Sequence, residues 1–188
     1  EANKHGVNTV CEFFSENLAD KILKEYGKVD SFLAANVMCH IPNINDVALG
    51  ISELLNENGV LIFEDPYLGA VIEKTSYDQI YDEHVFLFSI YSVEAIFSKF
   101  GLHLFDVEFL ETHGGSMRYY LSKRKDIPNS KNLLLSKENE NKLKLNQIET
   151  FIKFSENVKS SKSKLIGILD EIKNKNKLIY GYAATSKS

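Results

Sequence analysis

Two kinds of hydrophobic pattern alternate over the first two thirds of the chain. Short, nearly continuous apolar runs at residues 29–36 and 60–63 are typical of strands buried on both faces. Between and after them, apolar residues recur three or four positions apart, which is typical of helices. Strands joined by crossover helices predict a parallel sheet covered on both faces, and hence an α/β fold.

Local signals predict where these elements begin and end. Residues 7–14 begin as a short β-rich run, and Ser15 is the expected N-cap of a helix that ends at Gly27. Asn45 or Asp46 is the expected cap of the next helix. The other predicted elements are a turn at 58–59, helices near 68–80 and 92–100, and a hairpin of strands 102–110 and 116–122.

The polar segment 123–132 is the best candidate for a domain boundary, separating a domain at residues 1–122 from a region at 133–188. Beyond it, helical spacing predicts one long helix or two, with a core-facing stripe of Leu143, Ile148, Phe151, Ile152, Val158, Leu165, Ile168, Leu169 and Ile172. Residues 177–182 predict a buried strand that leads into a turn of small residues. A helix normally follows such a turn, so we expect the chain to be cut there.

Composition excludes several classes of protein. The chain has 188 residues, 44% of them hydrophobic, which is enough for one core and part of a second. It contains no apolar run of about 18 residues, as a membrane span requires, and no secretory signal at its start. Cys11 and Cys39 form no CxxC pair, so they predict neither a zinc site nor a disulfide framework, and a reducing cytoplasm is expected.

Charge is unevenly distributed around a net value of −4. Residues 1–120 carry 7 Lys/Arg and 19 Asp/Glu, whereas residues 121–188 carry 15 and 7. The simplest interpretation is that the lysines solvate the outer face of long helices; a cationic cofactor in one part and an anionic substrate in the other is the alternative. The basic part has no interleaved aromatics, which argues against binding to nucleic acid.

Residues able to do chemistry gather in three segments. Residues 36–42 follow a buried strand, and ligands of open α/β sheets bind at such strand ends, so His40 stands where a functional residue is expected. Residues 81–84 place Tyr, Asp, Glu and His in four consecutive positions. Residues 112–118 contain two glycines that permit close backbone approach, with a serine and an arginine that bind anionic or hydroxylated ligands.

Each segment also has a purely structural interpretation. A lone histidine near a strand end is more often a satisfied structural residue than a catalyst. Residues 81–84 are equally compatible with a solvated loop, and residues 112–118 with a hairpin turn. Asp, Glu and His are all metal ligands, but adjacent residues rarely converge on one ion and no second ligand pair is apparent, so no metal site is predicted.

Several motifs occur in one order along the chain: Phe13-Phe14-Ser15, Asn36-Val37 with His40-Ile41-Pro42, Glu64 with Pro66-Tyr67, Ile80-Tyr81 with Glu83-His84, His113-Gly114-Gly115-Ser116 with Arg118, and Gly181-Tyr182-Ala183-Ala184-Thr185 with Lys187. Together they resemble the keto-sugar C-methyltransferase family over nearly the whole chain. Asp82, Leu87 and Ala183 depart from residues common in that family, namely His, Tyr and Gly. The first two departures leave the identity of the substrate open.

The resemblance implies a three-part enzyme. It has an N-terminal zinc-binding domain, a central Rossmann-like class I domain that binds S-adenosylmethionine (SAM), and a C-terminal domain that helps to bind a nucleotide sugar. Residues 1–122 would be the C-terminal portion of the SAM domain, and 133–188 a helical connector and the start of the last domain. The zinc domain, the glycine-rich SAM loop and the acidic residue for the SAM ribose are then expected to precede residue 1.

The implied reaction transfers a methyl group from SAM to the carbon next to the ketone of a nucleotide-linked 4-keto-deoxysugar, expected to be TDP-linked. Removal of the α-proton gives an enolate, and that step needs a base with a pKa near neutrality. The motif match implies His84 as the base, Glu83 to orient it or share the proton, and Tyr81 and His40 to stabilise the enolate. It implies Phe13 and Phe14 near the adenine, Asn36 near the methionine part of SAM, and Tyr67, His113, Ser116, Arg118, Thr185 and Lys187 as substrate contacts.

Two rival functions stay open. One is a small-molecule SAM methyltransferase that acts on oxygen or nitrogen, which has less need of both the YxEH and HGGS motifs. The other is a catalytically inactive relative that still binds nucleotide sugar. Exchange of the sugar α-proton with solvent separates the first rival from a C-methyltransferase, and SAM binding argues against the second.

Overall fold

The structure is a computed structural model that describes residues 2–181. The described chain divides into two compact units between Asn146 and Gln147. The predicted boundary at residues 123–132 therefore lies inside the first unit, as a surface connector. All residues of the candidate site that the structure describes belong to this first unit.

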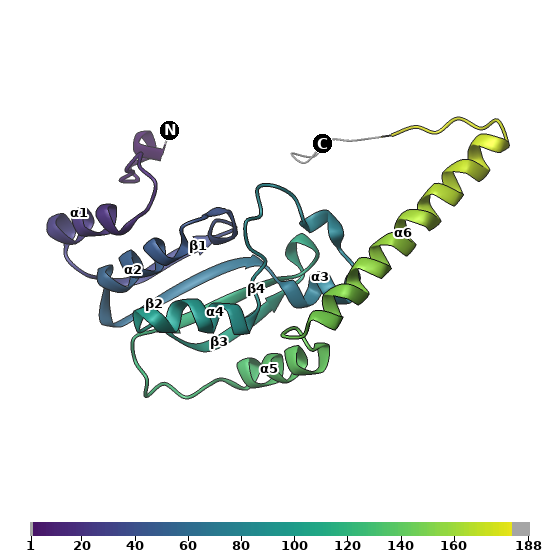
Figure 1. The fold of residues 1–188 in the computed structure, drawn as a ribbon. Coiled ribbons are helices and arrows are strands. Elements are labelled where there is room, and N and C mark those ends of the chain that lie inside the picture. Colours follow the sequence, from purple (N-terminus) through teal and green to yellow (C-terminus); the bar gives the residue numbers. More distant parts are fainter. Residues whose placement is uncertain (1, 182–188) are drawn as a thin grey trace. The chain divides into compact units, whose positions relative to one another are not determined.

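An open four-stranded sheet forms the centre of the first unit (Figure 1). Its strands are β1 (Val29–Ala35), β2 (Leu55–Pro66), β3 (His103–Leu110) and β4 (Ser116–Ser122). The order is β1-β2-β4-β3, in which β1 and β2 are parallel and β4 is antiparallel to both of its neighbours. The predicted α/β fold is confirmed, as is the antiparallel hairpin at its end.

The described chain contains six α-helices, of which the first five belong to the first unit: α1 (Glu16–Tyr26), α2 (Ile44–Leu54), α3 (Leu68–Lys74), α4 (Ile90–Phe97), α5 (Lys131–Leu143) and α6 (Ile148–Asn174). Sequence signals set several of their ends. The Ser15 hydroxyl accepts a hydrogen bond from Leu18 N at the start of α1, and Gly27 ends that helix at a φ of 80°, both as predicted. A reciprocal capping box of Ser89 and Ser92 starts α4.

The hydrophobic core lies between one face of the sheet and the helices α2 and α4. Phe63 of β2 is fully buried there, stacked on Tyr119 of β4 with ring centroids 4.8 Å apart. Ile51 of α2 and Phe97 of α4 are fully buried in the same cluster. Figure 1 shows these two helices side by side over the sheet. This packing fixes where β1 and β2 end, and so where the site begins.

The opposite face of β1 and β2 is open in the first unit, so the prediction of a sheet covered on both faces was wrong for the described residues. Leu33 of β1 is 69% exposed. Together with Ile62, Glu64 and Arg118 it lines a shallow depression of about 330 Å³. An apolar run therefore predicted the strand correctly but not which of its faces would be covered.

Several predicted boundaries differ from the structure. Residues 7–14 form no strand. The N-cap residue of α2 is Asn43, two positions before Asn45 and three before Asp46, the two expected caps, and its side chain makes no capping hydrogen bond. Strand β2 begins at Leu55 and runs through the expected turn at 58–59. Helix α3 stops at Lys74 because Thr75 adopts a left-handed conformation with φ 54°.

A buried glutamate connects α5 to the rest of the first unit. Glu140 has no exposed surface and accepts three hydrogen bonds: from Tyr67 Oη (3.0 Å), Ile90 N (2.6 Å) and Tyr91 N (3.3 Å). Two of these donors are backbone N–H groups in the first turn of α4, which lack partners within the helix. A negative charge at that end also interacts favourably with the helix dipole. This is why α5 belongs to the first unit.

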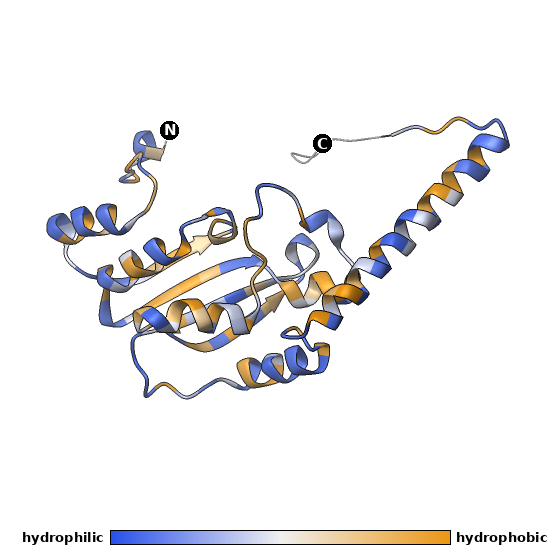
Figure 2. Cartoon of the chain, viewed as in Figure 1, coloured by the Kyte–Doolittle hydropathy of each residue, from blue (hydrophilic) through white to orange (hydrophobic). Residues whose placement is uncertain are grey.

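Helix α6 contains no buried residue, so the prediction that its apolar stripe faces a core was wrong for the described chain. Ile148 and Ile168 are more than half exposed, and Figure 2 shows apolar residues recurring along the helix. The segment 177–181 forms no strand, and Tyr182 lies outside the described residues. Among the described residues, no helix combines the length and apolar character that a membrane crossing requires.

Candidate active site

The site begins where β1 and β2 end. Asn36 follows β1 with φ 51°, and its backbone N donates to Glu64 O at 2.7 Å. This left-handed residue turns the chain into a short 3₁₀ helix, Met38–His40. The turn brings His40 to the carboxyl end of the strand, where open α/β sheets bind their ligands.

His40 meets His84 across two segments far apart in sequence. Their ring centroids lie 5.0 Å apart, and Tyr81 Oη lies 2.9 Å from His84 Nε2. Phe86 N donates to Cys39 O at 3.1 Å, which ties the loop after residue 80 to the 3₁₀ helix. Cys39, His40, Tyr81 and His84 are called the histidine cluster below. The structure thus brings together three of the four residues predicted to be catalytic.

Backbone carbonyls fix the orientation of both imidazoles. His40 Nδ1 donates to Glu83 O at 2.7 Å, and His84 Nδ1 donates to Gln79 O at 2.8 Å. A carbonyl only accepts, so Nδ1 of each ring carries a proton and Nε2 carries the lone pair of the neutral ring. Glu83, the fourth predicted residue, has an exposed side chain and contributes its carbonyl to this arrangement.

A buried carboxyl group that we had not predicted lies beside the cluster. Asp65 has no exposed surface, and its two oxygens make no hydrogen bond of normal geometry with the described residues. Burial raises its pKa to about 6, an effect that the neighbouring Cys39 and the charge of His40 partly offset. The period of two along β2 could have revealed it, because Leu61, Phe63 and Asp65 point to the same buried face.

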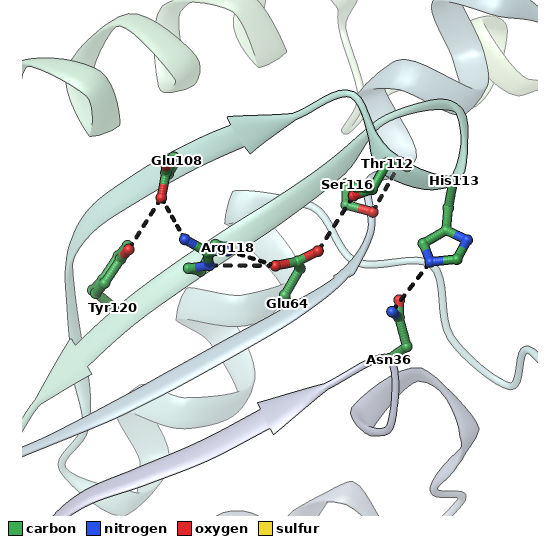
Figure 3. Close-up of polar contacts among 8 residues, drawn as sticks. All are labelled: Asn36, Glu64, Glu108, Thr112, His113, Ser116, Arg118 and Tyr120. Atoms are coloured by element: carbon green, nitrogen blue, oxygen red, sulfur yellow. Dashed lines mark hydrogen bonds and ion pairs between the residues drawn. The ribbon is translucent and has the colours of Figure 1, made fainter.

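A second group of polar side chains lies near the ends of β1 and β2 and in the turn between β3 and β4 (Figure 3). Asn36 Nδ2 lies 3.2 Å from His113 Nε2, and Thr112 Oγ1 donates to Glu64 Oε1 at 3.3 Å. Ser116 is buried and its hydroxyl donates to Thr112 O at 3.2 Å. His113 therefore meets the predicted cofactor residue Asn36, and Thr112 meets Glu64 near the end of β2.

Arg118 is engaged by two carboxylates. Its Nη2 lies 3.0 Å from Glu64 Oε2, and its Nη1 lies 2.8 Å from Glu108 Oε2 (Figure 3). The phenol of Tyr120, followed by the carboxylates of Glu64 and Glu108, raises the pKa of the guanidinium above its ordinary value. A phosphate at Arg118 would have to compete with both carboxylates, so its predicted contact with the substrate stays a prediction.

Of the three other predicted substrate residues, the structure describes one. Tyr67 is 3% exposed and its hydroxyl donates to Glu140, so its side chain takes part in packing in this structure. Thr185 and Lys187 lie outside the described residues. Their predicted contacts stay predictions.

A mainly apolar groove of about 700 Å³ lies next to the histidine cluster. His40 lines it together with both predicted adenine contacts, Phe13 and Phe14. Phe13 is 98% exposed, whereas Phe14 packs edge-on against Phe32 of β1, with ring centroids 4.8 Å apart. An open apolar wall beside a set of polar groups is typical of a small-molecule site.

Sequence comparisons match part of the chain to C-methyltransferases. Residues 111–188 match a family model described as the C-methyltransferase C-terminal domain. The C-methyltransferase NovU of Streptomyces niveus is 33% identical over 116 residues, which are 62% of this chain and 28% of NovU. Over these residues the chain is similar to C-methyltransferases. The match covers little more than a quarter of the length of NovU.

Solved structures give weaker likenesses. A SAM-dependent methyltransferase from Anabaena variabilis aligns with a TM-score of 0.46 and 12% identity, over 63% of this chain and 62% of that protein. Magnesium protoporphyrin IX methyltransferase from Synechocystis, solved with SAH, aligns with a TM-score of 0.39 and 14% identity, over 50% of this chain and 44% of that protein. Both likenesses are partial and concern the fold alone.

Proposed function

We propose that the protein containing this chain transfers a methyl group from SAM to the carbon next to the ketone of a nucleotide-linked 4-keto-deoxysugar. The observation that carries the proposal is the histidine cluster: two oriented imidazoles and a phenol at the carboxyl end of β1, beside an apolar groove. A carbon acid needs a base for its proton and donors for the enolate oxygen that forms.

His84 suits the role of base. Its Nδ1 proton is held by Gln79 O, so Nε2 is the atom that accepts a proton from the substrate. The imidazolium that results keeps its bond to that carbonyl, which stabilises the charged form. Tyr81 Oη, 2.9 Å from Nε2, is placed to move its hydrogen bond to the substrate as the enolate forms.

His40 suits the role of a second donor at the enolate oxygen. Its Nδ1 is fixed on Glu83 O, so its Nε2 must be protonated to donate to an enolate. In this proposal Glu83 positions His40 through its carbonyl, in place of the expected carboxylate contact with His84.

The apolar groove fits the adenosine part of SAM. Phe13 and Phe14 offer aromatic and apolar surface for a purine, and Asn36 lies at the neighbouring strand end, where the methionine part would bind. SAM supplies an electrophilic methyl group when it is bound. The task of these residues is to hold that methyl in line with the enolate carbon, which is a matter of positioning.

Exchange of the substrate α-proton with deuterated solvent tests the role of His84. In the full-length protein with a TDP-4-keto-deoxysugar, His84→Ala should lose exchange and turnover by at least about 100-fold while SAM affinity stays nearly constant. His5→Ala is the control and should behave like the unmodified protein. Near-normal exchange in His84→Ala would refute the assignment of the base.

A further inference from the structure

Three potential metal ligands converge in the histidine cluster. One ligand atom each from Cys39, His40 and His84 lies within 4.8 Å of the other two. Cys39 and His40 come from the 3₁₀ helix after β1, and His84 comes from the loop after residue 80. The fold therefore supplies the second ligand segment that is not apparent from the sequence.

Both histidines are held as metal-bound histidines usually are. In protein metal sites the ring nitrogen that does not bind the metal commonly donates to a backbone carbonyl or a carboxylate. Here Nδ1 of His40 donates to Glu83 O and Nδ1 of His84 donates to Gln79 O. Nε2 of each ring then carries the lone pair that could bind an ion; at His84 the ion would take the place of the Tyr81 Oη hydrogen bond of 2.9 Å.

The buried Asp65 carboxyl is an independent indication of a cation. It is completely buried, and neither oxygen has a hydrogen-bond partner of normal geometry among the described residues. Buried polar groups are nearly always satisfied, and an exception commonly marks a bound water or ion. Asp65 interacts with both Cys39 and His40, so its negative charge lies next to two of the three ligands.

We propose that Cys39, His40 and His84 bind a zinc ion. Thiolate and imidazole are the ligands that Zn²⁺ prefers, at about 2.3 Å and 2.0–2.1 Å, and three protein ligands leave a fourth position for water. Those bond lengths require the ligand atoms to approach by only about 1 Å from their present spacing. On binding, the Cys39 thiol loses its proton to solvent. If the proposed function holds, the ion also occupies the nitrogen of the catalytic base, so zinc inhibits methyl transfer.

Cobalt titration of the reduced, metal-free 188-residue chain tests the site without any enzyme assay. Co²⁺ replaces Zn²⁺ in tetrahedral sites, and a thiolate ligand gives a charge-transfer band in the near ultraviolet. We expect one equivalent of Co²⁺ to produce that band and Zn²⁺ to displace it, with the zinc affinity measured against a chromophoric chelator. Cys39→Ala should lose the band, and His84→Ala should weaken zinc binding by at least about 10-fold.

The second cysteine provides the matched control. Cys11 is exposed and lies outside the cluster, so Cys11→Ala should keep both the band and the affinity. A band that persists in Cys39→Ala, or no cobalt binding at all, would overturn the proposal. If circular dichroism shows that Cys39→Ala does not fold, the affinity of His84→Ala decides. Because these readouts do not involve methyl transfer, failure of the zinc site is distinguishable from failure of the proposed function.

Discussion

The hydrogen bonds of Glu140 lead to a quantitative prediction about stability. In Glu140→Ala, Tyr67 Oη and Ile90 N lose their acceptor inside the protein, and both residues are almost fully buried. A buried donor left without a partner costs about 1–3 kcal/mol. Tyr91 N is only partly buried and can be hydrated, so it adds little.

The two buried donors together predict a loss of about 2–6 kcal/mol. Removal of the carboxylate recovers part of this, because burial raises the pKa of Glu140 and so disfavours its charged form. We therefore expect Glu140→Ala to lower the free energy of unfolding by about 3 kcal/mol. Glu140→Gln keeps an acceptor of the same shape and should cost roughly half as much or less.

Urea unfolding followed by circular dichroism measures both variants against the unmodified chain. A common slope with a lower midpoint would show that stability changed and that the unfolded state did not. The reasoning would be refuted if Glu140→Ala fell within about 0.5 kcal/mol of the unmodified chain, the range of ordinary surface substitutions. It would also be refuted if Glu140→Gln were as destabilising as Glu140→Ala.

Two other substitutions test the surroundings of the site. Burial raises the pKa of Asp65 to about 6, so folding favours its protonated form. The stability that this carboxyl contributes is therefore fully present below about pH 4 and is lost as the pH rises through 6. That loss amounts to about 3 kcal/mol. The free energy of unfolding of Asp65→Asn should therefore rise relative to that of the unmodified chain as the pH increases over this range. The same pH dependence of stability in both proteins would contradict this prediction. In Gly115→Ala, at φ 134°, the new Cβ would lie 2.5 Å from Ala70 Cβ, which predicts a thermal midpoint well below that of Gly114→Ala, where nothing lies within 4 Å. Equal thermal midpoints of the two variants would contradict the close approach of Gly115 to Ala70.

Much of the fold follows from short-range signals in the sequence. Ser15 and Gly27 mark both ends of α1 because a cap and a left-handed terminus depend on local chemistry. The covering of the sheet depends on which segments pack against it, so the apolar run containing Leu33 could not reveal that one face stays open. For the same reason the apolar stripe of α6 predicted its helix but not its exposure.

The sequence indicated most of the residues of the site but not the contacts between them. Motif order indicated His40, Tyr81 and His84, and the fold brings them together. The roles of Cys39 and Asp65 depend on contacts between segments more than 20 positions apart, which no local pattern encodes. Thr185 and Lys187 stay predictions from motif resemblance.

Methyl transfer from SAM carrying a labelled methyl group tests the central claim most directly. The full-length protein is incubated with labelled SAM and a TDP-4-keto-deoxysugar, and the position of the label in the product is determined by NMR. The proposed function predicts label on the carbon next to the ketone. Label on oxygen or nitrogen, or no transfer although SAM and sugar both bind, would contradict it.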